Sequence, residues 1–232
     1  MTQLYGRPAN LVPLSFDPQL ASWDAAGQPG QLRLARFLAD LESVATPIMA
    51  SFHGPLAVEL MVGLPSTIPL TTGGRDLDNY LYPVAQRLGA TGLTAVFGRK
   101  AHEPSWLAVG SAQPDTTKTT PPRFATRIAG SYTRAEWKEA LRDRLLLAQV
   151  RPAEPGAVEM DIAVTTSAGR NWANLWKPLI DAFGPILGED PVRPFHPHDD
   201  RIVSLGLHHN VAAGIGDDVI VEAWWNSVVA TY

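Results

Sequence analysis

The chain has 232 residues, of which 45% are hydrophobic, and a net charge of −4. This length allows a sizeable buried core, built as one large domain or two small ones. The absence of cysteine excludes disulfides, thiolate zinc sites and cysteine nucleophiles, and the negative charge argues against a protein that coats nucleic acid, because duplex binding usually needs a basic face.

The N-terminal residues MTQLYGRPANLVPLSFDP (1–18) lack the basic region and apolar core of a secretory signal. The sequence holds no apolar run long enough for a membrane span. It also holds no Gly-rich phosphate loop, no nucleophile elbow and no dinucleotide fingerprint. We therefore expect a cytoplasmic protein without a dinucleotide cofactor or a membrane partner, and we interpret residues 1–30 as an N-terminal arm.

The first predicted helix covers 31–45, where apolar residues recur at helical spacing. A mostly apolar strand follows at 55–64, and a connector of ten residues leads to RDLDNYLYPVAQRLG (75–89). This segment predicts a short helix with Pro83 in its first turn, where proline is tolerated. The strands SWLAVGSA and RFATRIAG then complete a predicted unit, 31–130.

The second half repeats this order of elements. A helix is predicted at 133–149, with Thr133 and Glu136 as a capping box at its start. A strand at 156–164 and a five-residue connector lead to RNWANLWKPLIDAFG, and the strands RIVSLGLH and DDVIVEAWW complete a second unit, 131–232.

The two halves also share residues. Ala57 and Ala157 each open an Ala-Val-Glu run, 100 positions apart. After connectors of ten and five residues, the segments 75–89 and 170–184 align without gaps. Identical residues then recur 95 positions apart: Arg75, Asn79, Pro83 and Gly89 meet Arg170, Asn174, Pro178 and Gly184. The repeat predicts an α/β fold of two tandem units, each helix, strand, helix, strand, strand, in which Asn79 and Asn174 each begin a helix.

The runs AVELMVGLP and GRDLDNYL resemble the core of the RusA-like Holliday junction resolvases. In that family a strand and a basic loop lead to Arg-Asp-Leu-Asp-Asn at the start of a helix, a lysine follows one turn on, and an acidic pair opens the next strand. Its members are homodimers that cut four-way DNA junctions with magnesium, in DNA recombination and repair. The resemblance covers 31–130 once and 131–225 again. It implies two RusA-like units fused as a pseudo-dimer, branched DNA as a partner, and Mg²⁺ or Mn²⁺ as cofactor.

The family motif is divided between the two halves. The first half keeps Asp76, Asp78 and Asn79, but Tyr82 stands where the lysine belongs. The second half has Lys177 and an acidic pair, but Asn171 and Ala173 replace the two aspartates. At an offset of 95 that acidic pair faces Pro104 and Ser105. The resemblance implies metal ligation by Asp76, Asp78, Asp199 and Asp200, catalysis by Asp76, Asp78, Lys177 and Asp200, and nucleic-acid contacts by Arg75 and Arg170.

Carboxylates are the ligands that hard cations need in phosphodiester cleavage. Asp76 and Asp78 would face one ion from the same side of an extended segment, and Lys177 would stabilise charge on the phosphate. The same run is also typical of a helix N-cap with acidic residues in its first turn. The acidic pair is also typical of a solvated turn, and Lys177 of an exposed lysine. Arg75 and Arg170 would contact phosphate or tie the connectors to the body.

Histidine and tryptophan near these segments allow other interpretations. His196 and His198 beside the acidic pair would suit a transition metal, although their Pro-rich surroundings favour a surface loop. The consecutive residues His208 and His209 are expected to be exposed. The pair Trp224 and Trp225 is expected to pack in the core or at an interface.

We expect each acidic motif to face its own half, which would place Asp199 and Asp200 too far from Asp78 to complete one site. Two functions remain open. The first is a Mg-dependent, structure-specific DNA endonuclease of RusA-like type, with weak or lost activity. The second is a relative that no longer cuts and instead binds nucleic acid, binds a protein partner or serves as a structural subunit. Either would be a monomeric pseudo-dimer or a higher oligomer of it.

Overall fold

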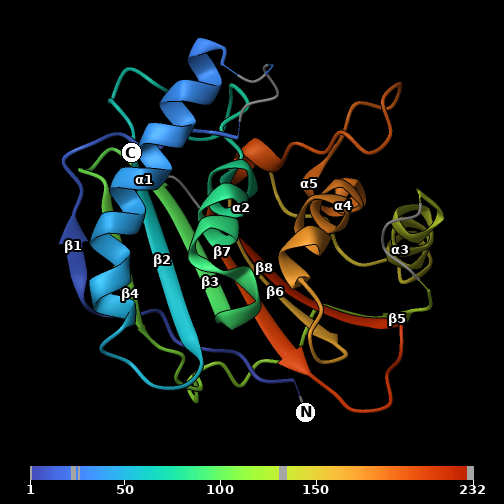
Figure 1. Cartoon of the computed structure of the whole chain (residues 1–232). Coiled ribbons are helices and arrows are strands. Elements are labelled where there is room, and N and C mark those ends of the chain that lie inside the picture. The colour runs from blue at the N-terminus through green and yellow to red at the C-terminus, as the bar shows by residue number, and fades with distance from the viewer. Residues whose placement is uncertain (1, 22–24, 26, 131–134, 229–232) are drawn as a thin grey trace.

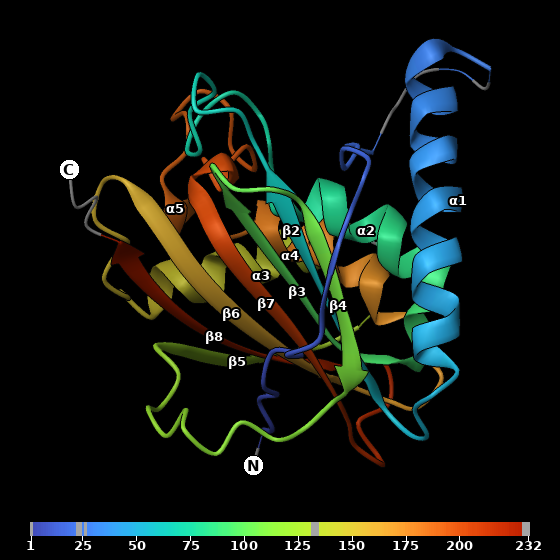
Figure 2. The same cartoon turned by 90° about the vertical axis from the view of Figure 1, so that its left-hand side faces the viewer.

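The computed structural model describes residues 2–21, 25, 27–130 and 135–228. An eight-stranded mixed sheet forms the centre, and its helices lie on one face (Figure 1). The N-terminal arm and the loop between β4 and β5 cross the other face (Figure 2). The strands are β1 (Leu11–Pro13), β2 (Leu56–Gly63), β3 (Leu93–Ala101), β4 (Trp106–Ser111), β5 (Phe124–Ile128), β6 (Ala157–Thr166), β7 (Ile202–Val211) and β8 (Val219–Val228).

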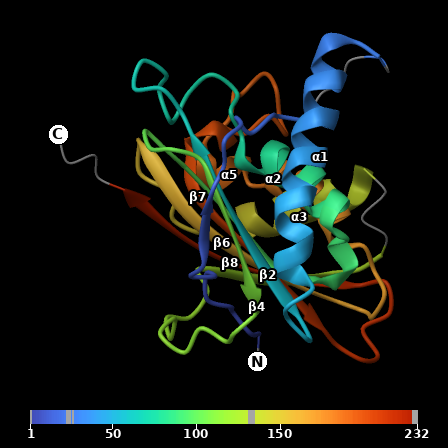
Figure 3. The same cartoon turned by 60° about the vertical axis from the view of Figure 1, so that its left-hand side comes forward.

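The longer helices are α1 (Pro29–Met49), α2 (Leu77–Leu88) and α3 (Ala135–Leu147), and the second half adds the short helices α4 (Trp176–Asp181) and α5 (Gly184–Leu187). The helices predicted at 31–45 and 133–149 correspond to α1 and α3. The proposed capping residue Thr133 lies outside the described residues. Figure 3 shows α1 and α2 side by side on the same side of the sheet. A single hydrophobic cluster runs from α1 through both halves of the sheet to α3.

The strand order is β1-β4-β2-β3-β7-β6-β8-β5. It corrects the predicted strands of the first half. The segment LTAVFGRKA forms β3, which pairs parallel to β2 and had not been predicted. The segment SWLAVGSA forms β4, whereas RFATRIAG forms β5, which leaves the first half and pairs antiparallel to β8 at the opposite edge. The parallel β2–β3 pair is joined through α2, as a parallel crossover requires, and β4 then turns back onto β2.

Strand pairing repeats on the two sides of the sheet's middle. β3 and β7 are antiparallel neighbours at the middle. On one side β3 pairs parallel with β2, which pairs antiparallel with β4. On the other side β7 pairs parallel with β6, which pairs antiparallel with β8. Both parallel pairs have a register shift directly after their first residue pair. That first pair is Leu56 with Leu93 in β2–β3 and Val158 with Ile202 in β6–β7. The strands therefore match Leu56 with Val158, and the pairing of Ala57 with Ala157 read from the sequence is wrong.

The middle of the sheet is the β3–β7 pair. Phe97, four residues after Leu93, pairs with Gly206, four residues after Ile202. An approximate two-fold axis of strand pairing thus passes between these two residues. The same register makes Ala90 and Thr91, which precede β3, equivalent to Asp199 and Asp200, which precede β7. The predicted counterparts of the acidic pair, Pro104 and Ser105, are wrong for this reason.

The repeated Arg-x-x-x-Asn segments start their helices differently from the prediction. α2 begins at Leu77, with Asp76 at the N-cap position and without a side-chain capping bond, so Asn79 lies inside the first turn. Asn174 lies within a 3₁₀ turn, Trp172–Leu175 (η2), that precedes α4. Pro83 falls in the interior of α2 and not in its first turn.

Proline at this position leaves the carbonyl of Asn79 without its usual helical donor, because residue 83 has no N–H. The backbone N–H of Ala21, in the N-terminal arm, donates to that carbonyl at 2.8 Å. The arm therefore completes the hydrogen bonding of α2 as well as pairing with β4 through β1.

Candidate metal centre

Three carboxylates gather at one edge of the sheet. Asp76, Asp78 and Asp199 each offer an oxygen within 4.8 Å of the others. Asp76 and Asp78 lie at the start of α2, just beyond the C-terminal ends of the parallel strands β2 and β3. Asp199 opens the 3₁₀ turn Asp199–Arg201 (η3) before β7. Because β7 runs antiparallel to β3, its first residues lie at that same edge. The expectation that the two acidic motifs lie apart is therefore wrong.

Lys177 joins this cluster from the second half. Its Nζ lies 3.5 Å from Asp199 Oδ2, 3.9 Å from Asp78 Oδ2 and 3.0 Å from Asp181 Oδ1. The third of these contact residues, Asp181, stands one helical turn after Lys177 on α4, a spacing that brings side chains together. Lys177 keeps nearly half of its side chain exposed, so its head group faces both the carboxylates and the solvent. The halves therefore supply complementary parts of one site.

Two charged residues of the site had not been singled out from the sequence. Asp181 could have been found from its i, i+4 spacing to Lys177. Lys100, on β3, is 3% exposed, and its Nζ donates to the main-chain carbonyls of Arg75 at 2.9 Å and of Asp200 at 2.5 Å. It thereby fixes the connector before α2 to the turn before β7. No local sequence pattern pairs Lys100 with a residue 100 positions further along the chain.

Burial and like charge disturb the titration of the cluster. Burial raises the pKa of Asp78 to about 7; Lys177 opposes the rise, and Asp199, Asp76 and Asp181 add to it. Burial also raises the pKa of Asp199 to about 6, with Asp76 adding to the rise. The pKa of Asp76 is raised in the same way, by burial first. A bound cation would relieve both the repulsion and the cost of burying these charges.

The donor set suits a hard cation, because all three groups are carboxylates. Oδ1 of Asp76 is buried and has no hydrogen-bond partner, while its Oδ2 accepts a bond of 3.0 Å from Asn79 Nδ2. Two oxygens bound to Mg²⁺ at about 2.1 Å lie about 3.0 Å apart when adjacent and about 4.2 Å apart when opposite. The three carboxylate oxygens here lie within 4.8 Å of one another, so they would have to move closer together to bind one ion. With that movement the cluster could hold a metal ion, although its geometry alone does not identify the element.

The remaining predicted site residues lie around the cluster or away from it. Asp200 turns its Oδ2 toward the backbone N–H of Gly74, at 3.4 Å, and lines a cavity of about 470 Å³ with Thr71, Thr72 and His198 among others. Arg75, half-buried, adjoins the cluster through its backbone contact to Lys100. Arg170 instead donates to the carbonyl of Asp217 at 2.9 Å, at the end of β6 away from the cluster.

The two predictions about His208 and His209 are wrong, because both side chains are buried in the central strand β7. Nε2 of His208 lies 3.1 Å from Asp161 Oδ1, and its Nδ1 accepts a bond from the backbone N–H of Tyr5. His209 stacks on Trp172, with ring centroids 5.1 Å apart. Trp225 packs in the core as expected.

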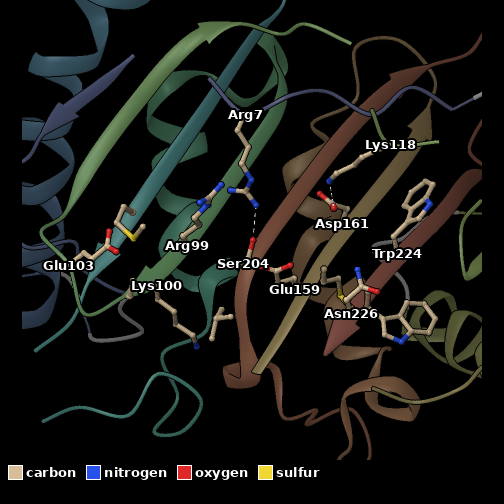
Figure 4. Close-up of a pocket in the computed structure, with 15 residues that line it drawn as sticks. Arg7, Arg99, Lys100, Glu103, Lys118, Glu159, Asp161, Ser204, Trp224 and Asn226 are labelled. Atoms are coloured by element: carbon tan, nitrogen blue, oxygen red, sulfur yellow. Dashed lines mark hydrogen bonds and ion pairs between the residues drawn. The ribbon is translucent and has the colours of Figure 1, made fainter. Parts of the chain in front are cut away.

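A second hollow, of about 510 Å³, opens on the helix-free face of the sheet (Figure 4). Four of its charged lining side chains form ion pairs: Arg7, Arg99, Lys118 and Asp161. Arg7 and Arg99 both pair with the buried carboxylate of Glu59, and Arg7 Nη2 donates to Ser204 Oγ at 2.8 Å. On the other side Lys118 pairs with Asp161 (Figure 4). These contacts anchor the arm and the β4–β5 loop across the middle of the sheet.

Among the described residues, no helix combines the length and apolar character needed to cross a membrane. Comparisons with known protein families, with curated proteins and with solved structures find no match to this chain.

Proposed function

We propose that the protein is a Mg²⁺-dependent, structure-specific DNA endonuclease of RusA-like type. One observation carries the proposal: Asp76 and Asp78 of the first half meet Asp199 and Lys177 of the second. Each half alone holds an incomplete set of the residues that the resemblance nominates. Their meeting removes the main reason for expecting an inactive relative.

The chain's own residues divide the work as follows. Asp76, Asp78 and Asp199 would hold the cation, which when bound supplies positive charge to the phosphate and an activated water. Burial opposes the charge on Lys177, but Asp78, Asp199 and Asp181 outweigh it and raise the pKa of this lysine. Lys177 therefore stays protonated at neutral pH, where it can stabilise a phosphate oxygen but cannot act as a base.

Lys100 has a positioning role in this scheme. Burial lowers its pKa to about 8, while Asp76 and Asp200 oppose that change. Its bonds run to backbone carbonyls of the two segments that carry the carboxylates. Lys100 thus sets the distance between the start of α2 and the start of β7.

The proposal includes a fused pseudo-dimer of two RusA-like units, 31–130 and 131–232, after the arm 1–30. The repeated strand order and the two-fold β3–β7 pairing support it. The edge strands suggest a refinement: β5 stands beside β8 as β1 stands beside β4. Each unit would then begin with its own edge strand.

The test is cleavage of an end-labelled four-way junction with Mg²⁺ or Mn²⁺. We expect incision by the native chain and a loss of at least 100-fold in Asp78→Asn, because one ligand charge is removed. Asp143→Asn, an exposed substitution on α3, is the matched control for the change in charge and should leave the rate unchanged. Equal rates for the native chain and Asp78→Asn would refute the assignment of the site.

A non-cutting function is the second candidate, and the net charge of −4 favours its form as a protein-binding or structural subunit, since duplex binding usually draws on a basic face. The excess acid lies after residue 130, where 9 Lys and Arg stand against 14 Asp and Glu. Such a protein would bind the junction, or a protein partner, without a metal. Junction binding that is insensitive to EDTA and leaves the strands intact would support this candidate over the first.

A further inference from the structure

The approximate two-fold axis assigns every residue of the acidic cluster a counterpart in the other half. The repeated helix segments match Asp76 with Asn171, Asp78 with Ala173, Lys177 with Tyr82 and Asp181 with Gln86. The central strands match Asp199 with Ala90 and Lys100 with His209. Each of these six exchanges replaces a charged group with a neutral or apolar one at neutral pH: burial lowers the pKa of His209 to about 4.

The counterpart position is filled by contacts among these neutral groups. The hydroxyl of Tyr82 donates to Asn174 Oδ1 at 3.1 Å, and Asn171 Nδ2 donates to Gln86 Oε1 at 3.2 Å. The indole N–H of Trp172 donates to the carbonyls of Ala90 and Leu93, each at 3.0 Å. The neutral amides hold α2 against η2, and the ring of Trp172 holds η2 against the turn before β3.

These groups do not suit a catalytic cation. Mg²⁺ in phosphoryl-transfer sites is held by one or more carboxylates, and in the part of the chain that the structure describes, Asp76, Asp78 and Asp199 form the one grouping of three or more potential ligands. Tyr82 replaces the cation that Lys177 supplies on the other side. The axis therefore relates a charged centre to a neutral structural contact.

We infer that each chain has one catalytic centre and cuts one strand of a branched DNA in each binding event. This inference rests on the proposed function. In the step itself a water oxygen bonds to phosphorus, the bond from phosphorus to one bridging oxygen breaks, and the departing oxygen takes up a proton. A protein with two equivalent centres would make this cut on two strands of the junction, whereas this chain can make it on one.

The first test uses a supercoiled plasmid that extrudes a cruciform. One incision at the junction gives a nicked circle, and paired incisions across it give a linear molecule. With enzyme below the plasmid concentration, we expect nicked circles to exceed linear molecules at least tenfold through the early time course. Linear product that appears first, without nicked circles before it, would overturn the inference.

The second test measures Mn²⁺ binding by calorimetry and does not depend on cleavage. With one centre, Asp78→Asn removes all high-affinity binding, whereas with two centres it would leave about half. The substitutions Tyr82→Phe and Asn171→Ala, at the counterpart position, serve as controls and should change neither binding nor the cleavage products. Circular dichroism of each variant checks that it has folded.

The two tests separate the possible failures. Mn²⁺ binding that Asp78→Asn abolishes, together with intact plasmid, refutes the endonuclease and leaves the single centre standing. If Asp78→Asn keeps about half of the Mn²⁺ binding, or if linear product appears early, the single centre is refuted and the proposal of an endonuclease is unaffected. No Mn²⁺ binding by the native chain refutes both.

Discussion

At the scale of one residue, Asp78 is a carboxyl group that the fold buries among other carboxylates, which makes its ionised form unfavourable. Its side chain is 4% exposed, and the charges of three other aspartates and of Lys177 act on it. A carboxyl group that stays exposed in a turn would titrate near its ordinary pKa. The environment of Asp78 therefore makes both the pH and the presence of a cation matter for the stability of the whole chain.

The metal-free protein should lose stability as the pH rises from 5 to 8. The pKa of Asp78 in the folded state, about 7, lies above its ordinary value of 3.8, and that of Asp199, about 6, does too. The folded state therefore holds protons that the unfolded chain has released, and this stability is fully present below pH 4 and lost as the pH passes through 6 and 7. For Asp78 alone the loss is on the order of 3 kcal/mol. Urea unfolding in EDTA at several pH values measures it, and a slope in Asp78→Asn as steep as in the native chain would contradict the assignment.

A divalent cation should reverse this loss. At pH 7.5 a hundredfold excess of ion over Kd contributes about 2.7 kcal/mol, or roughly 5 to 10 °C in Tm for a chain of this size. Thermal unfolding with and without Mg²⁺ or Mn²⁺ is the measurement. The shift should vanish in Asp199→Asn and persist in Asp200→Asn, because only the first residue has its carboxylate in the cluster. Equal shifts in both variants would show that the ion binds elsewhere.

At the scale of the elements, β3 and β7 join the two sides of the sheet, and small residues let them do so. Gly206 lies at the centre of β7, opposite Phe97. A Cβ built on Gly206 would come within 2.1 Å of Asp161 Oδ1 and 3.1 Å of His208 Nε2. The missing side chain therefore makes room for the part-buried Asp161–His208 hydrogen bond.

Gly206→Ala should destabilise the fold by about 1 to 3 kcal/mol, because the added methyl group displaces Asp161 from its partner in a packed site. Gly92→Ala is the matched control, since a Cβ at Gly92 would meet nothing within 4 Å and its φ is not positive. Chemical denaturation compares the two variants. A cost for Gly206→Ala no larger than that of the control would show that the strand relaxes without disturbing the hydrogen bond.

Sequence patterns predicted those helices and strands whose signals lie within one short segment of the chain. The apolar spacing of 31–45 predicted α1, the capping box at 133–136 predicted α3, and the repeat predicted the shared order of helix and strand. The run LTAVFGRKA of β3 was not predicted as a strand. It carries two cations near its end, Arg99 and Lys100, whose partners are distant in the sequence: Glu59 and the carbonyls of Arg75 and Asp200. β5 was misplaced because strand pairing between 124–128 and 219–228 is invisible in either segment alone.

The candidate site could be predicted only as a set of residue types. Asp76, Asp78, Lys177 and Asp199 were nominated from the resemblance, but each acidic motif was expected to face its own half, which would keep the two sets apart. The helix segments and the strands follow different offsets, because the connectors between α2 or α4 and the next strand differ in length. The register of β3 with β7 decides the distance between the acidic motifs, and that register is a tertiary property.

At the scale of the whole molecule, the two sides of the sheet share one continuous core inside a single chain. A homodimer obtains such a contact by association, which weakens on dilution, whereas a covalent link makes it independent of concentration. Within the part of the chain that the structure describes, the sheet ends in the short strand β1 on one edge and β5 on the other. One chain therefore supplies all three carboxylates of the acidic cluster.

The chain should sediment as a monomer of 25.1 kDa across micromolar concentrations, and Mn²⁺ should bind with the same affinity per chain at every concentration. Analytical ultracentrifugation and calorimetry at two concentrations tenfold apart test both statements. An obligate dimer, or metal affinity that rises with chain concentration, would mean that a partner chain helps to form the site.

The division of the cluster between α2 and the turn before β7 also has a kinetic consequence. Asp78 and Asp199 come together only after β7 has docked on β3, a pairing between segments more than 100 positions apart, and such distant contacts form late because loop closure is costly. A folding intermediate with only the first half ordered would offer the ion Asp76 and Asp78, and one with only the second half ordered would offer Asp199 alone. The cation therefore cannot guide early folding, and its binding free energy should appear almost entirely as slower unfolding. A metal that binds after the last folding step would stabilise the native state kinetically, by slowing its unfolding, without speeding its folding.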